Sequence, residues 1–129
     1  MVVEDERIIA RDLQAILQRA GYRVPSLAAS GEEAIRAAEK FKPDLILMDI
    51  VLQGEMDGIS AADQIRELLG IPVIYLSSCG DPAILDRAET TEPLGYVLKP
   101  YEEKNLLTTI EVVLRQHRTS PQRAGPRGD

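Results

Sequence analysis

Four charged side chains, Glu4, Asp5, Asp49 and Lys99, stand next to the carboxyl ends of three separate apolar segments. Apolar segments of this length, bounded by turn residues and alternating with helical patterns, are typical of buried parallel strands. In an open parallel sheet the carboxyl ends of the strands lie along one edge, where ligands bind. The sequence therefore predicts that these four side chains meet at that edge.

The chemistry expected of this group is metal and phosphate binding. Three carboxylates brought together repel one another, and one of them takes up a proton unless a cation joins them. Carboxylate oxygens select hard cations, so we expect Mg²⁺, with Mn²⁺ or Ca²⁺ as substitutes. A lysine at the same edge supplies a point charge for a phosphoryl oxygen.

Five strand-then-helix units are expected to position these side chains. The predicted strands are residues 1–3, 22–28, 45–48, 73–76 and 96–98, and the predicted helices are residues 8–20, 31–41, 58–69, 82–91 and 102–117. Pro25 interrupts the second strand and places it at or near a sheet edge. Ser30, with Glu33 three positions later, and Asp57 are predicted helix N-caps. The alternation predicts an α/β fold with a doubly wound parallel sheet.

Length and composition favour one small domain. The chain has 129 residues, which is the size of a single domain. Its net charge of -6 argues against nucleic-acid binding. It has neither an apolar stretch of the roughly 20 residues needed to span a membrane nor a signal-type start. A single cysteine, Cys79, fits a reducing compartment, and the expected localisation is cytoplasmic, without membrane insertion.

The order of the motifs resembles the response regulator receiver domain of two-component signal transduction. The matching motifs are Glu4-Asp5, Asp49, Met56-Asp57-Gly58, Ser77-Ser78 after residues 71–76, and residues 95–100. The resemblance spans residues 1–117 and implies a flavodoxin-like (βα)5 fold, with five parallel strands in the order 2-1-3-4-5 and helices on both faces. Residues 118–129, with prolines, glycines and arginines but no apolar period, are expected to be a disordered linker or an artificial tail.

The resemblance also implies roles for individual residues. Asp49 would accept a phosphoryl group from a sensor histidine kinase or a phosphotransfer domain, with Lys99 and Ser77 contacting phosphoryl oxygens. The implied Mg²⁺ ligands are Asp5, Asp49 and the backbone carbonyl of Val51, with Glu4 acting largely through water. The domain would catalyse its own phosphorylation and dephosphorylation, yet it is a phosphorelay acceptor and not a conventional enzyme.

A switch is implied as well. Ser77 would move toward the phosphoryl group, and Tyr96 would turn from an outward to an inward rotamer. The surface formed by the fourth helix, the fifth strand and the fifth helix would read out this change, and in many relatives the same surface mediates homodimer contacts. The resemblance further implies a cis peptide bond between Lys99 and Pro100.

Three other classes of protein share this fold or some of these residues. A nucleotide- or flavin-binding protein lacks support, because no glycine-rich loop follows the first strand. A phosphatase of the aspartyl-phosphate type would carry its nucleophile after the first strand, where this chain has Glu4-Asp5. An interaction module that works without phosphorylation remains the main alternative, although the presence of both Asp49 and Lys99 argues against it.

Overall fold

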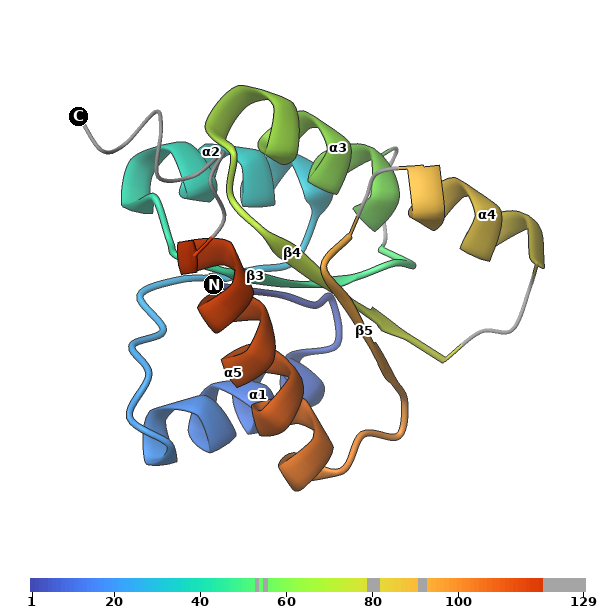
Figure 1. Ribbon diagram of the computed structural model, residues 1–129. Coiled ribbons are helices and arrows are strands. Elements are labelled where there is room, and N and C mark those ends of the chain that lie inside the picture. The colour runs from blue at the N-terminus through green and yellow to red at the C-terminus, as the bar shows by residue number, and fades with distance from the viewer. Residues whose placement is uncertain (53, 55, 79–81, 91–92, 120–129) are drawn as a thin grey trace.

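The computed structural model describes residues 1–52, 54, 56–78, 82–90 and 93–119. Five parallel strands form one sheet in the order β2-β1-β3-β4-β5, as predicted (Figure 1). The strands are β1 (Val2–Val3), β2 (Leu27–Ala28), β3 (Ile46–Asp49), β4 (Val73–Ser77) and β5 (Gly95–Leu98). Each strand is followed by a helix, and this alternation makes all pairings parallel.

The helices cover both faces of the sheet. They are α1 (Arg7–Arg19), α2 (Gly31–Phe41), α3 (Gly58–Leu69), α4 (Pro82–Thr90) and α5 (Glu103–Thr119). Helices α1 and α5 lie on one side of the sheet, and α2 and α3 lie on the other (Figure 1). The observed architecture is the flavodoxin-like sandwich that the sequence predicted.

Each face of the sheet has its own apolar core, because successive strand residues point to opposite sides. Met48 and Tyr75 pack on the side of α2 and α3. Their neighbours Leu47 and Ile74 pack on the side of α1 and α5. The central strands are therefore apolar throughout, and polar side chains can appear only where a strand ends.

Two helix starts follow from local capping. The Ser30 hydroxyl accepts a hydrogen bond from the backbone N–H of Glu33 at 3.2 Å, at the start of α2. The Asp57 carboxylate accepts one from the backbone N–H of Ser60 at 2.9 Å, at the start of α3. Both caps satisfy N–H groups that the helix leaves without partners, and both helices have the predicted bounds.

The second strand is shorter than predicted. Only Leu27–Ala28 pairs with β1, and residues 22–24 form a connection outside the sheet, so their assignment to a strand was wrong. Pro25 has no N–H to donate to a neighbouring strand, and the Val24 side chain instead joins the core beneath α1 and α5. β2 does lie at the sheet edge, as expected from the proline.

The last helix is longer than predicted. α5 continues through Thr119, past the expected end at residue 117, and residues 120–129 of the expected tail lie outside the described part of the chain. Within the described residues, no helix is long and apolar enough to cross a membrane.

Candidate functional site

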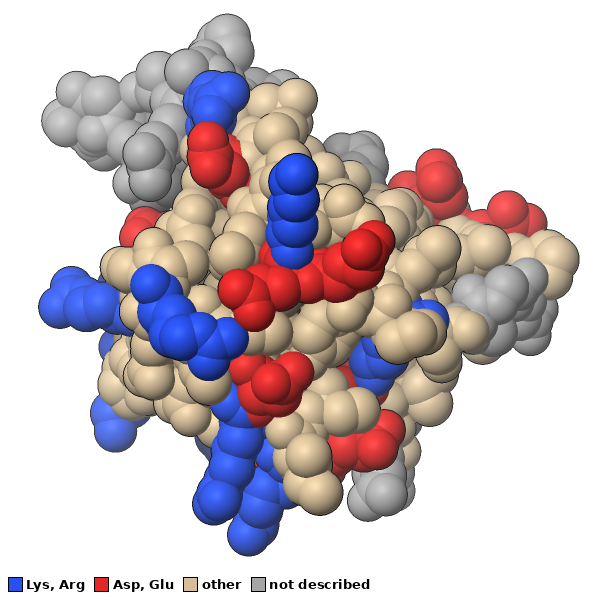
Figure 2. Space-filling model, turned by 90° about the horizontal axis from the view of Figure 1, so that it is seen from below, with Lys and Arg blue, Asp and Glu red and all other residues tan. Residues whose placement is uncertain are grey.

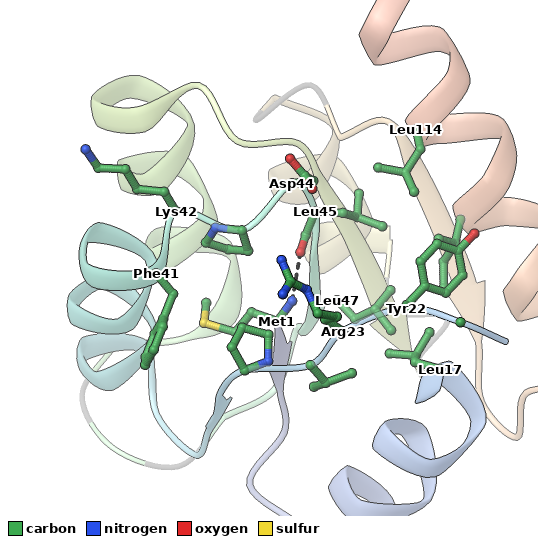
Figure 3. Close-up of a pocket in the computed structure, with 15 residues that line it drawn as sticks. Met1, Leu17, Tyr22, Arg23, Phe41, Lys42, Asp44, Leu45, Leu47 and Leu114 are labelled. Carbon is green, nitrogen blue, oxygen red and sulfur yellow. Dashed lines mark hydrogen bonds between the residues drawn. The ribbon is translucent and has the colours of Figure 1, made fainter. Parts of the chain in front are cut away.

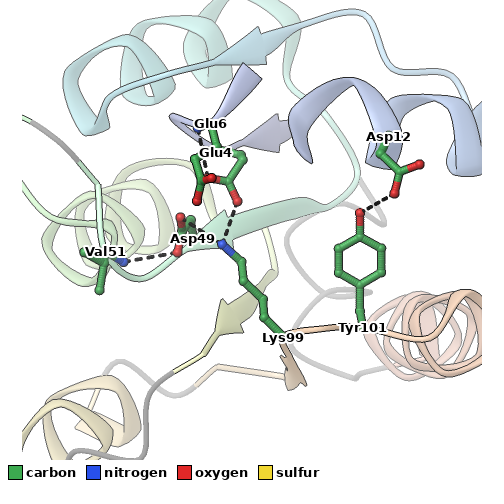
Figure 4. Close-up of polar contacts among 7 residues, drawn as sticks. All are labelled: Glu4, Glu6, Asp12, Asp49, Val51, Lys99 and Tyr101. Atoms are coloured by element: carbon green, nitrogen blue, oxygen red, sulfur yellow. Dashed lines mark hydrogen bonds and ion pairs between the residues drawn. The ribbon is translucent and has the colours of Figure 1, made fainter. Parts of the chain in front are cut away.

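The charged side chains predicted from the strand ends do come together. Glu4 follows β1, Asp49 ends β3 and Lys99 follows β5, all at the carboxyl edge of the sheet (Figure 4). The Lys99 Nζ donates hydrogen bonds to Glu4 Oε1 at 2.7 Å and to Asp49 Oδ2 at 3.2 Å. The lysine thus bridges two carboxylates that belong to different strands.

Backbone N–H groups fix the two carboxylates in place. The N–H of Val51 donates to Asp49 Oδ1 at 3.2 Å, and the N–H of Glu6 donates to Glu4 Oε2 at 3.1 Å. Both carboxylate side chains are buried, with exposed fractions of 0% for Glu4 and 8% for Asp49. Glu6 itself is exposed and stands at the N-cap of α1.

Burial and the neighbouring charges shift the pKa values of Asp49 and Glu4 in opposite directions. Burial, with the neighbouring Glu4 carboxylate, raises the pKa of Asp49 to about 7. Burial also opposes ionisation of Glu4, but hydrogen bonds from Lys99, Asp49 and the Glu6 N–H outweigh it and lower the pKa of Glu4. Burial similarly opposes the charge on Lys99, and the two carboxylates overcome it and raise its pKa. At neutral pH the pocket holds more negative charge than one lysine neutralises.

This charge excess fits a divalent cation. Ligand oxygens of Glu4, Asp5 and Asp49 all lie within 4.8 Å of one another. Asp5 is half-buried and the other two are buried, so the group opens toward solvent on the Asp5 side. Carboxylate oxygens at this spacing are suited to Mg²⁺, which takes one or two carboxylates and completes its octahedron with water and phosphate.

The structure places the two predicted switch residues, Ser77 and Tyr96, on neighbouring strands. Ser77 is the buried last residue of β4, and its carbonyl accepts a hydrogen bond from the Lys99 N–H at 2.9 Å. The Tyr96 ring lies 5.9 Å from the Tyr75 ring, centroid to centroid. Its hydroxyl is buried without a hydrogen-bond partner among the described residues, and burial raises its pKa, with a further contribution from Glu89.

Two further predictions concern the Lys99-Pro100 peptide bond and Cys79. The Lys99-Pro100 peptide bond is cis, as the resemblance implied. Cys79, which follows β4, lies outside the described residues.

Three contacts near the site were not predicted. A side chain on Gly58 would overlap the carbonyl oxygen of Asp49, so the start of α3 packs directly on the backbone of that strand end. Arg87 of α4 forms an ion pair with Asp57 at 2.8 Å. The Tyr101 hydroxyl donates to Asp12 Oδ2 at 2.7 Å and joins the turn after Lys99 to α1 (Figure 4). Only the glycine has a sequence signal, because glycine permits close backbone approach.

Two further surface features are the distribution of charge and one hollow. On the face seen in Figure 2, acidic and basic side chains are interspersed, and among the described residues shown there no continuous basic stripe appears. A hollow of about 390 Å³ lies at the amino ends of the strands, with Leu17, Leu47 and Leu114 inside and Arg23 and Asp44 at its rim (Figure 3). This hollow is at the opposite end of the sheet and takes no part in the carboxylate group.

Comparisons with known proteins agree with the fold. The family model of the response regulator receiver domain matches residues 1–111. The receiver domain of a modulated diguanylate cyclase from Desulfovibrio desulfuricans is similar in structure, with a TM-score of 0.85 and 35% identity, covering 89% of this chain and 91% of that one. The receiver domain of NtrX from Brucella abortus has a TM-score of 0.82 and 28% identity, with coverages of 92% and 98%.

Two curated relatives are transcriptional regulatory proteins by name. PdtaR of Mycobacterium tuberculosis is 32% identical over 118 residues, which are 92% of this chain and 57% of that protein. ResD of Bacillus subtilis is 33% identical over 116 residues, with coverages of 90% and 48%. This chain belongs to the response regulator receiver domain family of two-component systems. It spans about half the length of the curated relatives.

Proposed function

We propose that the domain accepts a phosphoryl group on Asp49 from the phosphohistidine of a sensor histidine kinase or a phosphotransfer domain. The observation that carries this proposal is the joint placement of Asp49 with two further carboxylates and Lys99 at one edge. This edge combines a nucleophilic oxygen, a metal-binding group and a cation for the phosphoryl oxygens. Membership of the receiver family supports the same conclusion.

The transfer is a displacement at phosphorus. A carboxylate oxygen of Asp49 forms the new O–P bond while the P–N bond to the donor imidazole breaks, and the electron pair of that bond stays on the imidazole nitrogen. Such transfers depend mainly on positioning and on neutralising charge, because the transition state needs little covalent help. Mg²⁺, when bound, supplies much of that neutralisation at the phosphoryl oxygens.

The surrounding residues have separate proposed roles. Asp5, Asp49 and the Val51 carbonyl would hold Mg²⁺ directly, and Glu4 would act largely through water. The Lys99 ammonium would replace its hydrogen bond to Asp49 with one to a phosphoryl oxygen. The flexible lysine side chain allows this change of partner. The Ser77 hydroxyl donates to a second phosphoryl oxygen. The phosphoryl group stays attached to the chain, so the domain of residues 1–117 is a signalling acceptor and not a conventional enzyme. Its proposed location is the cytoplasm.

We further propose that Ser77 and Tyr96 form the switch and that the α4, β5 and α5 surface reads it out, including through homodimer contacts. The buried Tyr96 hydroxyl without a described partner supports this, because an unsatisfied hydroxyl favours a second arrangement in which it is hydrated or bonded. Phosphorylation then has only to shift the population between two states.

Small phosphodonors test the acceptor role. With acetyl phosphate and Mg²⁺, the intact mass should rise by one phosphoryl group in the wild type, and EDTA should prevent this. Asp49→Ala should gain no phosphoryl group, whereas Asp86→Asn, on exposed α4 surface, should behave as the wild type. A gain of mass by Asp49→Ala at the wild-type rate contradicts the proposal.

Beryllofluoride, a mimic of the phosphoryl group, tests the switch. Its binding should change the aromatic NMR signals of Tyr96 and the sedimentation of the domain. If beryllofluoride is bound and neither quantity changes, this surface does not read out phosphorylation.

A further inference from the structure

Helix α4 is weakly attached to the rest of the domain. Among its residues Pro82–Thr90, all of them described, Ala88 alone is buried. Ile84 is half-buried and packs on the core next to α3. A helix with so little buried apolar area depends on its remaining contacts for its position.

One of those contacts is made by the Arg87 side chain. Its Nη1 donates to Asp57 Oδ2 at 2.8 Å, and its Nη2 lies 3.5 Å from both Asp57 Oδ1 and Ser60 Oγ. The guanidinium therefore holds both carboxylate oxygens, a two-point contact that fixes direction as well as distance. Partial burial opposes ionisation of Asp57, yet the hydrogen bonds from Arg87 and the Ser60 N–H keep its pKa below the usual value.

Asp57 in turn is joined to the acceptor strand. The next residue, Gly58, donates its N–H to the Ile50 carbonyl at 3.0 Å. A Cβ on Gly58 would overlap the Asp49 carbonyl oxygen. The start of α3 is thus packed against the backbone of Asp49 and Ile50, and a displacement of one requires a displacement of the other.

We infer that Arg87 is a positioning residue which, through its ion pair with Asp57, ties α4 to the backbone of the acceptor strand. The inference rests on the proposed function, because it assigns a route from an occupied Asp49 to the readout surface. Occupation of Asp49 shifts the strand end and the start of α3. The contact between Arg87 and Asp57 passes that shift to α4.

Substitution of Arg87 tests the positioning of α4 without disturbing the N-cap of α3, because Asp57 and its hydrogen bond from the Ser60 N–H stay in place. In Arg87→Ala without metal, hydrogen exchange of the α4 amides should be about two- to fivefold faster, the range that an exposed ion pair gives. Arg87→Lys should be intermediate, because an ammonium replaces only one of the two contacts. In 1 M NaCl the difference between Arg87→Ala and the wild type should shrink.

Arg19→Ala is the matched control. Arg19 forms a single-contact ion pair with Glu103 at 3.1 Å, with comparable exposure, and joins α1 to α5. Its loss should leave exchange in α4 unchanged. If Arg87→Ala and Arg19→Ala give the same exchange in α4, Arg87 does not position that helix.

The coupling is tested with beryllofluoride and Mg²⁺. In the wild type their binding should change exchange in α4, and in Arg87→Ala that change should fall to half or less although beryllofluoride still binds. An equal change in both proteins, or no change in the wild type with beryllofluoride bound, overturns the coupling. Absence of binding to the wild type would instead contradict the proposed function, and the metal-free comparison would still decide the role of Arg87.

Discussion

Removal of the charge at Asp49 should stabilise the metal-free domain at high pH. Burial and the Glu4 carboxylate raise the pKa of Asp49 from the usual 3.8 to about 7. The folded state therefore binds this proton more tightly than the unfolded chain does. Between about pH 4 and 7 the folded state holds more protons, so the free energy of unfolding falls as pH rises through this window.

The size of the effect follows from the same values. A pKa raised from 3.8 to about 7 corresponds to about 4 kcal/mol, at about 1.4 kcal/mol per pH unit. The opposite change at Glu4 offsets part of this. We therefore expect Asp49→Asn to raise the free energy of unfolding by about 1–3 kcal/mol at pH 8. At pH 5 Asp49 is neutral in the folded state but ionised in the unfolded chain, so about a third of that advantage, roughly 0.4–1 kcal/mol, should remain.

Urea denaturation in EDTA at both pH values measures this difference. Asp86→Asn, which removes an exposed carboxylate, should stay within about 0.5 kcal/mol of the wild type at pH 5 and at pH 8. Excess Mg²⁺ at pH 8 should stabilise the wild type more than Asp49→Asn, because it binds the folded carboxylates. The reasoning is refuted if Asp49→Asn has no advantage at pH 8, or if its advantage at pH 5 is as large as at pH 8.

Three further predictions concern the metal, a cap and a close contact. Asp5→Asn should weaken Mg²⁺ binding more than Glu4→Gln, because direct ligation outweighs contact through water, and equal losses in a calorimetric titration would contradict these roles. Ser30→Ala should lower the free energy of unfolding by about 1 kcal/mol, whereas Ser30→Asp should retain the cap of α2 in urea denaturation. Gly58→Ala should cost about 3 kcal/mol or prevent folding, because its methyl group overlaps the Asp49 carbonyl, and unchanged stability would contradict that packing.

Local signals explain which parts of the fold could be predicted. Ser30 and Asp57 fix the starts of α2 and α3 through bonds to residues three positions away, so these bounds can be read from the sequence. The second strand was predicted too long because residues 22–24 have strand-like side chains, and strand formation also needs a pairing neighbour. No sequence pattern reveals that Pro25 leaves this segment outside the sheet.

The site could be predicted only in part, because some of its contacts depend on how distant elements pack together. The parallel strand order places Glu4, Asp49 and Lys99 at one edge, and that follows from the alternation of strands and helices. The Asp57–Arg87 pair joins side chains 30 positions apart, and it depends on where α4 lies against α3. The closer approach of Lys99 to Glu4 than to Asp49 likewise depends on tertiary placement.

The chemical form of the phosphorylated product tests the central claim most directly. After treatment with acetyl phosphate and Mg²⁺, reduction by borohydride converts an aspartyl phosphate to homoserine, whereas a phosphate ester on a serine resists it. Tandem mass spectrometry should then find homoserine at position 49 and no phosphate on Ser77 or Ser78. Phosphate retained on either serine, or homoserine at another position, would contradict the assignment of Asp49 as the acceptor.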